Sequence, residues 1–256
     1  MAKVIFITGG SRGIGLAIGK KFAEDGNKVY FTYLKSTKSY FNKFAYFRSK
    51  NVIPIKCDMR NPKQIKSLLK KLRKEKKIDV LVNNVGDVIA RTSFHHSSVK
   101  LWEQTINLNL MSAVRTTHAL LPLLLKATPK HTTGIKYGDK IPVVVNISSI
   151  ASRAGGSGDS LHYGVAKAAL NIFTSGLARE FKRYDFGIRV VGIAPSIVDT
   201  DFQKRNSTKK RVKKIIDLTP MRRMASAEEI ANFAFYVASE KASYLSGDTI
   251  FVTGGR

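Results

Sequence analysis

The stretch Val4-Ile-Phe-Ile-Thr-Gly-Gly-Ser-Arg-Gly-Ile-Gly15 decides the fold of this chain, because it reads as a strand, a glycine-rich turn and the start of a helix. Glycines allow a tight turn and a close approach of backbone to ligand, and the amino end of a helix attracts an anion. The spacing Gly-x-x-x-Gly-x-Gly differs from the commoner Gly-x-Gly-x-x-Gly, but its context predicts a site for the pyrophosphate of a dinucleotide. The predicted contact residues are Gly9, Ser11, Arg12, Gly13, Ile14 and Gly15.

The rest of the chain alternates short β-branched runs with segments of helical period, which predicts parallel strands joined by helices. Strands are expected at residues 4–8, 28–33, 52–57, 80–82, 143–147, 188–193 and 249–252, and helices at 14–25, 62–76, 98–126, 162–184 and 226–239. We therefore predict an α/β fold, a Rossmann-like doubly wound sheet of about seven parallel strands flanked by helices, in a single domain spanning residues 1–256. Segment 199–225 follows the carboxyl end of a strand, where ligands of such sheets bind, and is a candidate substrate lid.

The charge balance is strongly basic, with 44 lysines and arginines against 18 acidic residues and a formal charge of +26 over 256 residues. Such a field attracts acidic partners, including nucleic acid, anionic membrane or an acidic carrier protein. Much of the excess is lysine on helices expected to be exposed, as in residues 66–77, so we favour composition as its main cause. Cys57 is the only cysteine, and no apolar run reaches the ~18 residues of a membrane span. We expect a soluble cytoplasmic protein without integral membrane association.

The end of the second predicted strand bears on the choice of dinucleotide. NAD sites commonly place an acid there, about 20 residues past the glycines, to bind the adenosine ribose. Residues 31–36 read Phe-Thr-Tyr-Leu-Lys-Ser and contain no carboxylate. Lys35, helped by Arg12 and Ser36, is instead placed to pair with a 2′-phosphate, so the sequence favours NADP over NAD.

The pair in Tyr163-Gly-Val-Ala-Lys167 points to the chemistry. On a helix, spacing i,i+4 puts the phenol and the ammonium on one face, and a nearby cation favours phenolate over phenol. We therefore expect Tyr163 to exchange a proton well below its usual pKa of about 10. The apolar stripe expected to be buried on the same helix comprises Val165, Ala169, Ile172, Phe173, Gly176 and Leu177.

Landmarks along the whole chain, in this order, resemble the short-chain dehydrogenase/reductase family. They are residues 8–15, Cys57-Asp58, Asn83-Asn-Val-Gly86, Trp102-Glu-Gln-Thr-Ile-Asn-Leu-Asn109, Asn146-Ile-Ser-Ser149, Tyr163-Gly-Val-Ala-Lys167 and Ile193-Ala-Pro-Ser-Ile-Val-Asp-Thr200. The chain departs from the family pattern at Ser196, where glycine is usual, and at Val85, where alanine is usual. These departures alter the surroundings of the pocket more than its chemistry.

The resemblance implies a role for each matching residue. Tyr163 would protonate the substrate carbonyl oxygen, Ser149 would hydrogen-bond the same oxygen, and Lys167 would lower the pKa of Tyr163 and hold the nicotinamide ribose. Asn109 would connect Lys167 to solvent in a proton relay. Asp58 would meet the adenine amino group, Asn83 would lie beside the adenosine, and Thr200 would contact the nicotinamide carboxamide. Ser148 and Ser152 are rival hydroxyls for the role of Ser149, Asp58 could instead cap a turn, and Asn109 could satisfy a helix backbone.

Residues 220–231 and 242–255 are similar to 3-oxoacyl-(acyl-carrier-protein) reductases, which implies NADPH-dependent reduction of a 3-oxoacyl thioester. A sugar or polyol dehydrogenase is the alternative within the family. A non-catalytic protein that binds nucleic acid or a membrane surface is the alternative outside it, and the intact Ser149, Tyr163 and Lys167 disfavour it. Family members assemble as tetramers or dimers, which implies packing of the helices near residues 98–126 and 162–184 across a two-fold axis. Asp87, His95 and His96 are weak candidates for the pocket entrance, and no metal site is expected.

Overall fold

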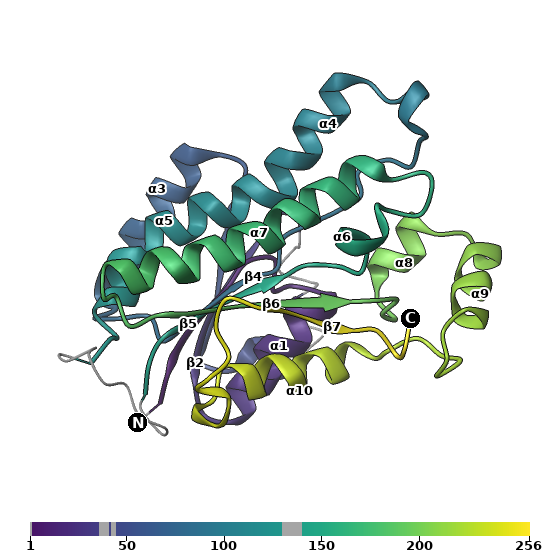
Figure 1. The fold of residues 1–256 in the computed structure, drawn as a ribbon. Coiled ribbons are helices and arrows are strands. Elements are labelled where there is room, and N and C mark those ends of the chain that lie inside the picture. The colour runs from purple at the N-terminus through teal and green to yellow at the C-terminus, as the bar shows by residue number, and fades with distance from the viewer. Residues whose placement is uncertain (1, 36–40, 42–44, 130–139) are drawn as a thin grey trace.

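Seven parallel strands form the sheet at the centre of the computed structural model, which describes residues 2–35, 41, 45–129 and 140–256 (Figure 1). The strands are β1 (Val4–Ile7), β2 (Lys28–Tyr33), β3 (Val52–Lys56), β4 (Val80–Asn83), β5 (Val143–Ile147), β6 (Arg189–Pro195) and β7 (Thr249–Val252). Their order is β3-β2-β1-β4-β5-β6-β7, and every neighbouring pair is parallel. The predicted doubly wound fold is confirmed. The strand order reverses between β1 and β4, the position at which such sheets bind ligands.

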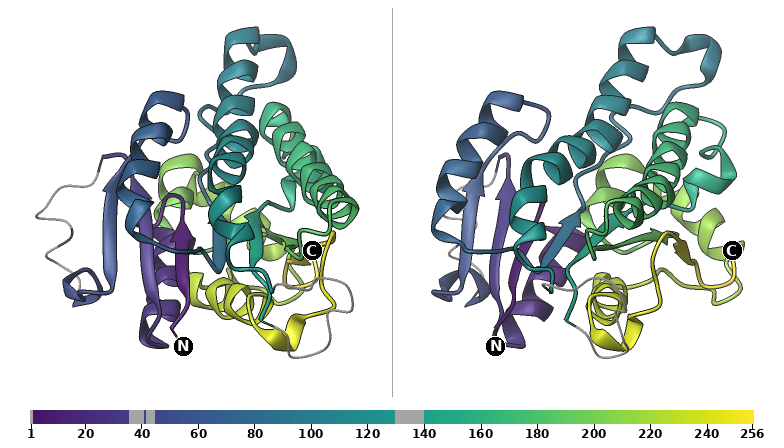
Figure 2. Two further views of the ribbon diagram at one scale, coloured as in Figure 1. Left: turned by 90° about the vertical axis from the view of Figure 1, so that its left-hand side faces the viewer. Right: turned by 60° about the vertical axis from the view of Figure 1, so that its left-hand side comes forward.

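Helices cover both faces of the sheet (Figures 1 and 2). The longer helices are α1 (Gly13–Glu24) and α10 (Ala227–Val237) on one face, and α3 (Pro62–Lys71), α4 (Val99–Ile106), α5 (Ser112–Leu125) and α7 (Leu161–Arg183) on the other. Short helices lie at α6 (Ala151–Ala154) and at Ala45–Arg48, Leu72–Lys74, Phe94–His96 and Glu240–Ala242. Side chains alternate along each strand, so Ile5 and Ile7 of β1 join the core beneath α1 and α10, whereas Phe6 joins the core beneath α3, α5 and α7. None of the described helices is both long and apolar enough to cross a membrane.

The helix predicted at residues 98–126 is interrupted. A π-helical turn at Asn107–Met111 separates α4 from α5 and carries the buried Asn109. Such a turn accommodates one extra residue and rotates the side chains that follow, and it often occurs at functional sites. Apolar periodicity does not reveal it, because both halves of the segment keep a helical pattern.

The stripe predicted to be buried on α7 is wrong. Val165 is 41% exposed and Ile172 is 72% exposed, whereas His162, Lys167 and Thr174 are almost fully buried. These polar side chains are buried because each has a hydrogen-bond partner within the protein. The face of α7 that meets the sheet is therefore partly polar, and an apolar face remains exposed.

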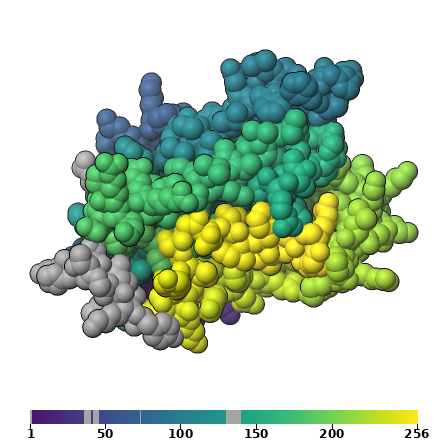
Figure 3. All heavy atoms as spheres, in the orientation of Figure 1, coloured from purple at the N-terminus to yellow at the C-terminus, as the bar shows by residue number. Residues whose placement is uncertain are grey.

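Segment 199–225 lies at the carboxyl end of β6 and extends from one end of the molecule (Figure 3). It contains two helices, α8 (Asp201–Asn206) and α9 (Lys209–Asp217). An isolated bridge between Val198 and Ala225 brings the ends of the segment together. The turns after β1, β4, β5 and β6 end at this same edge of the sheet, so their residues converge on one region.

Candidate active site

The glycine-rich turn after β1 is held between β2 and the turn after β4. Gly9 has φ +67°, and its amide donates to Thr32 Oγ1 at 3.0 Å. Asn84 Nδ2 donates to the carbonyls of Thr8 and Gly9 at 2.9 and 3.0 Å. A Cβ on Gly15 would approach Asn84 Nδ2 and the Gly9 oxygen to 2.5 Å. Asn84 thus fixes the turn so closely that the helix can begin there only with glycine.

The amino end of α1 is suited to an anion. Arg12, its N-cap residue, has extended backbone and makes no capping bond with its side chain, whereas Asn61, Ser98 and Ser226 cap their own helices. Uncapped amides at a helix start favour a phosphate. A Cβ on Gly13 would lie 3.5 Å from the Thr200 side chain. Gly13, which is expected at the pyrophosphate, and Thr200, which is expected at the nicotinamide carboxamide, are therefore neighbours. The residues present therefore fit a dinucleotide at this turn.

A cavity of about 300 Å³ opens beside the same turn. Its lining includes Arg12, Lys20, Thr200, Lys204 and Glu228, which come from α1, from segment 199–225 and from α10. Positive and negative side chains both line it, so the cavity has a mixed electrostatic character.

The residues predicted for the adenosine half are spread along the edge of the sheet. Lys35 is exposed just after β2, and Ser36 lies outside the described residues. Asp58 is bound by Arg60, whose Nη2 lies 2.7 Å from its Oδ2, and this partner lowers the pKa of the carboxyl. A cofactor that meets Asp58 would do so beside this ion pair.

Asn83 is buried, and its side chain takes part in a polar network within the helical layer. Its Nδ2 donates to Thr117 Oγ1 at 3.0 Å and to Asn146 Oδ1 at 2.9 Å, and Asn146 in turn donates to Thr174. This network crosslinks β4 and β5 to α5 and α7. The Nδ2 of Asn83 is thus committed to this network, whereas its Oδ1 is buried without a hydrogen-bond partner. The predicted role of Asn83 beside the adenosine stays a prediction.

Lys167, the second member of the predicted pair, is 2% exposed. Its Nζ donates to the carbonyl of Ile147 at 2.8 Å and lies 5.8 Å from the centroid of the Tyr163 ring. Removal from water lowers the pKa of Lys167 to about 8. The ammonium is thus positioned by the end of β5, under the face of the phenol.

The pKa of Tyr163 differs from the expectation. Burial raises the pKa to about 12, while a hydrogen bond with the Ser149 side chain lowers it, and the charges of Asp87 and Arg91 raise and lower it respectively. The predicted depression by Lys167 does not occur in this structure, because desolvation outweighs the attraction of a cation held at the ring face. Tyr163 is therefore protonated throughout the neutral range, as a proton donor must be.

The neighbouring serines are distinguished by their partners. Ser148 Oγ donates to Asn171 Oδ1 at 2.6 Å, and Ser152 Oγ donates to the Ser149 carbonyl at 2.7 Å. Ser149 Oγ accepts from the amide of Ala151 at 3.1 Å and shares a hydrogen bond with Tyr163. Of the three serines, Ser149 is the one that the fold brings to Tyr163, and its role toward the substrate stays a prediction.

Asn109, in the π-helical turn, lies next to Lys167. A Cβ on Gly86 would approach Asn109 Oδ1 to 2.6 Å and Lys167 Nζ to 3.0 Å, so only a glycine fits between them. Asn109 Nδ2 donates to the carbonyls of Asp87 and Thr105, and its Oδ1 accepts from the amide of Asp87 at 3.1 Å. The alternative role of satisfying helix backbone is thus real for Nδ2, and the side chain also fixes the turn after β4.

Comparison with known proteins gives this arrangement a family. Residues 9–256 match the family model described as enoyl-(acyl carrier protein) reductase. The chain belongs to the short-chain dehydrogenase/reductase family.

Among relatives of this short-chain dehydrogenase/reductase, the 3-oxoacyl-(acyl-carrier-protein) reductase FabG of Escherichia coli strain K12 is 31% identical over 254 residues, with 99% of this chain and 96% of the relative covered. FabG of Chlamydia pneumoniae is 30% identical over 261 residues, covering 100% and 97%. The ligand-free structure of Thermoplasma acidophilum aldohexose dehydrogenase superposes with a TM-score of 0.81 at 26% identity, covering 99% of this chain and 93% of that one. The protein is thus an oxidoreductase of a family that uses a nicotinamide dinucleotide.

Sequence reasoning missed several residues that shape the site of this short-chain dehydrogenase/reductase. Asn84 and Gly86 were noted only as landmarks, although their positions beside the glycine turn and Lys167 are now explained. Of the three candidates for the pocket entrance, Asp87 is bonded to Asn109 and to segment 199–225, whereas His95 and His96 are exposed. The described residues include no group of His, Cys, Asp or Glu side chains that could hold a metal ion.

Proposed function

We propose that this protein catalyses the NADPH-dependent reduction of a ketone to a secondary alcohol, with a 3-oxoacyl thioester of a carrier protein, or a related 3-oxoacyl thioester, as substrate. The observation that carries the proposal is the protonated Tyr163, hydrogen-bonded to Ser149 and placed over the Lys167 ammonium. A phenol held in its neutral form is prepared to give a proton to a carbonyl oxygen, which is the direction of reduction. The similarity to 3-oxoacyl-(acyl-carrier-protein) reductases supports the substrate class.

The nicotinamide, when bound, would supply the hydride. The Ser149 hydroxyl and the Tyr163 hydroxyl would donate hydrogen bonds to the substrate oxygen and stabilise charge that develops on it. Lys167, held by the Ile147 carbonyl, would stabilise the phenolate left after the proton moves. Asn109, which lies on the other side of Gly86 from Lys167, would order the water through which Tyr163 regains its proton.

The preference for NADP rests on charge. Lys35 is exposed after β2, Arg12 stands at the start of α1, and no carboxylate follows β2 among residues 33–35. A 2′-phosphate would gain charge-assisted hydrogen bonds from these cations, whereas the ribose hydroxyls of NAD would lack their usual acceptor. The proposed cofactor site is completed by Gly9, Ser11, Gly13, Ile14, Gly15, Asp58, Asn83 and Thr200.

The proposal extends to partners and location. The +26 charge suits an acidic carrier protein, and Lys204 and Lys209 are exposed beside the site. The exposed apolar side chains of Val165 and Ile172 on α7 suit a homodimer or homotetramer. A cytoplasmic location is consistent with a buried thiol in a chain that has one cysteine.

A sugar or polyol dehydrogenase is the second candidate, favoured by a specific observation. Asp87 and Arg91 act electrostatically on Tyr163, so charged groups border the position of the reacting oxygen. Such groups suit hydroxyl-rich substrates better than an alkyl chain. The match in fold to an aldohexose dehydrogenase supports the same candidate.

A substrate panel tests the choice. In one assay the purified protein is mixed with NADPH and an acetoacetyl thioester, either of a carrier protein or of a small thiol. In the other it is mixed with NADP and an aldohexose or a polyol. The absorbance of the reduced nicotinamide is followed in both. We expect oxidation of NADPH with the thioesters, little turnover with sugars, and slower reaction with NADH. Turnover of sugars without turnover of thioesters would replace the first candidate by the second.

A further inference from the structure

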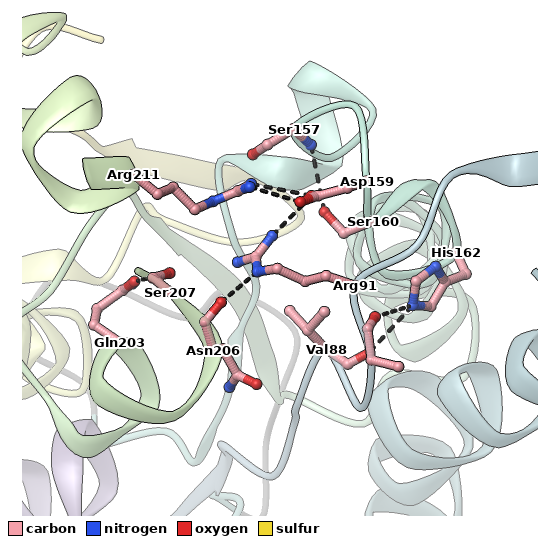
Figure 4. Close-up of polar contacts among 11 residues, drawn as sticks. Val88, Arg91, Ser157, Asp159, Ser160, His162, Gln203, Asn206, Ser207 and Arg211 are labelled. Atoms are coloured by element: carbon pink, nitrogen blue, oxygen red, sulfur yellow. Dashed lines mark hydrogen bonds and ion pairs between the residues drawn. The ribbon is translucent and has the colours of Figure 1, made fainter. Parts of the chain in front are cut away.

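One carboxylate joins three segments that are distant in sequence (Figure 4). Asp159, in the loop before α7, accepts from Arg211 of α9 through Nη1 at 2.7 Å and Nη2 at 3.1 Å. Arg91, in the loop after β4, donates from Nη1 to the same carboxylate at 3.0 Å. Bidentate pairs between arginine and carboxylate are the strong and geometrically specific kind.

The joint is better shielded than an ordinary surface ion pair. The side chains of Arg91, Arg211 and Asp159 are 24%, 20% and 33% exposed. The backbone reinforces it, because the amide of Thr92 donates to the Asp159 carbonyl at 2.8 Å. Arg91 also donates from Nε to the carbonyl of Asn206, the last residue of α8. Arg91 thus ties α8, and Asp159 ties α9, to the body of the protein.

Arg91 itself is presented by a constrained turn. Ile89 has φ +66°, which is unfavourable for a β-branched residue, and the Ala90 amide bonds back to the Val88 carbonyl at 2.8 Å. His162 Nε2 lies 3.1 Å from the carbonyls of both Val88 and Ala90. The buried imidazole holds the strained turn against α7, next to Tyr163.

The tied segment contributes to the active site. The ring of Phe202 on α8 lies 6.4 Å from that of Tyr163, and Thr200 at the start of α8 borders Gly13. Asn206 Nδ2 donates to Asp87 Oδ1 at 2.8 Å. A displacement of α8 and α9 would therefore open the substrate side of Tyr163 and unseat Thr200.

We propose that Asp159 is a positioning residue that holds segment 199–225 closed over Tyr163 by pairing with Arg91 and Arg211 together. The inference rests on the proposed function for its kinetic consequence, whereas the closure itself does not depend on which ketone is reduced. Asp87 bonds the same segment, but its own charge acts on Tyr163, so Asp159 is the better position at which to test closure.

Limited proteolysis with trypsin measures how often segment 199–225 opens. Lys209, Lys210, Lys213 and Lys214 on α9 are exposed cleavage sites, and Asp159→Asn leaves all of them in place. We expect cleavage within α9 of the full-length protein to be about tenfold faster in Asp159→Asn, because local opening exposes the helix to the protease. The matched control is Asp79→Asn, which alters a carboxylate bonded to Lys77 and Val4 far from the segment, and α9 should be cleaved there at the wild-type rate.

Kinetics test the positioning role. With any ketone that the enzyme reduces, Asp159→Asn should raise KM about tenfold and leave kcat within about twofold, and Asp159→Glu should recover part of the KM because it keeps the charge. A loss in kcat alone would overturn the positioning role. Equal cleavage of α9 in wild type and Asp159→Asn would overturn the closure. Because this assay needs no ketone, it gives an answer even if the proposed function is wrong, so the two failures are distinguishable. Thermal unfolding of both Asp159 variants checks that each is folded. If Asp159→Asn does not fold, the cleavage of α9 and the KM are compared between wild type and Asp159→Glu.

Discussion

The burial of Lys167 leads to a quantitative prediction about stability. The side chain is 2% exposed, and its pKa is lowered to about 8 from the ordinary 10.5 by removal from water. Below about pH 8 the folded and the unfolded chain both carry this proton. Between about pH 8 and pH 10.5 the folded chain has lost the proton while the unfolded chain keeps it. The unfolded state then binds more protons, so this residue makes the folding free energy more favourable as the pH rises through that window.

The magnitude follows from the two pKa values. A pKa difference between 10.5 and about 8 corresponds to about 3 kcal/mol when the window is crossed completely. Between about pH 7 and pH 9.5, where only part of the window is crossed, the gain is about 2 kcal/mol. Tyr163 contributes little, because its pKa is raised to about 12 in the folded chain and an unfolded phenol, with a pKa of about 10, is still mostly protonated at about pH 9.5.

Lys167→Met removes the charge and keeps the length of the side chain. Urea unfolding of wild type and variant at about pH 7 and pH 9.5 gives two differences in the free energy of unfolding, and other titrating groups cancel between the proteins. We expect wild type to gain about 2 kcal/mol on the variant between the two pH values. The control is Lys182→Met, an exposed lysine in the last turn of α7, for which the difference should stay constant. A constant difference for Lys167→Met as well would refute the claim that desolvation governs this ammonium.

Further predictions concern the cofactor and the packing of the site. Tyr163→Phe should reduce turnover by at least about a hundredfold, because the proton donor is lost, while NADPH affinity measured by fluorescence titration stays nearly unchanged; retained turnover would exclude Tyr163 as the donor. Lys35→Asp should weaken NADPH more than NADH, and an unchanged ratio of the two dissociation constants would remove Lys35 from the phosphate site. Gly86→Ala should lower the free energy of unfolding by about 1–3 kcal/mol and impair turnover, because its methyl group would meet Asn109 Oδ1 at 2.6 Å and Lys167 Nζ at 3.0 Å. Gly176→Ala on exposed α7, where a Cβ has no neighbour within 4 Å, should instead stabilise by about 0.5–1 kcal/mol, and equal effects of the two in urea unfolding would contradict the crowding at Gly86.

Strands were predictable because a doubly covered parallel sheet demands continuous apolar runs. Each of the seven expected runs contains the observed strand or overlaps it, and β6 ends at Pro195 rather than at the predicted residue 193. Where prediction failed, a side chain was buried for a reason other than hydrophobicity. Lys167 and Thr174 are enclosed because Ile147 and Leu170 offer carbonyl partners, and no periodicity in the sequence announces those partners.

The family landmarks identified the side chains that are predicted to be catalytic, but the sequence could not give the pKa values of those side chains. Spacing placed Lys167 one turn from Tyr163, from which a lowered phenol pKa was expected. The sign changed because the outcome depends on two distances that spacing does not fix, namely from the ammonium to the phenolic oxygen and from that oxygen to water. In the folded chain Lys167 is drawn toward the end of β5, and burial of Tyr163 dominates.

The contrast between Asp58 and Asp159 shows why long-range pairing escapes sequence analysis. Asp58 pairs with Arg60, two residues away, so a local motif suffices to suggest a capped turn. Asp159 is joined to Arg91 and Arg211, each more than fifty residues away, with separations of 68 and 52. Only the convergence of strand ends at one edge of the sheet brings these charges together. Since the same edge gathers the predicted cofactor and proton-donor residues, charges that meet there are able to couple the position of segment 199–225 to the environment of Tyr163.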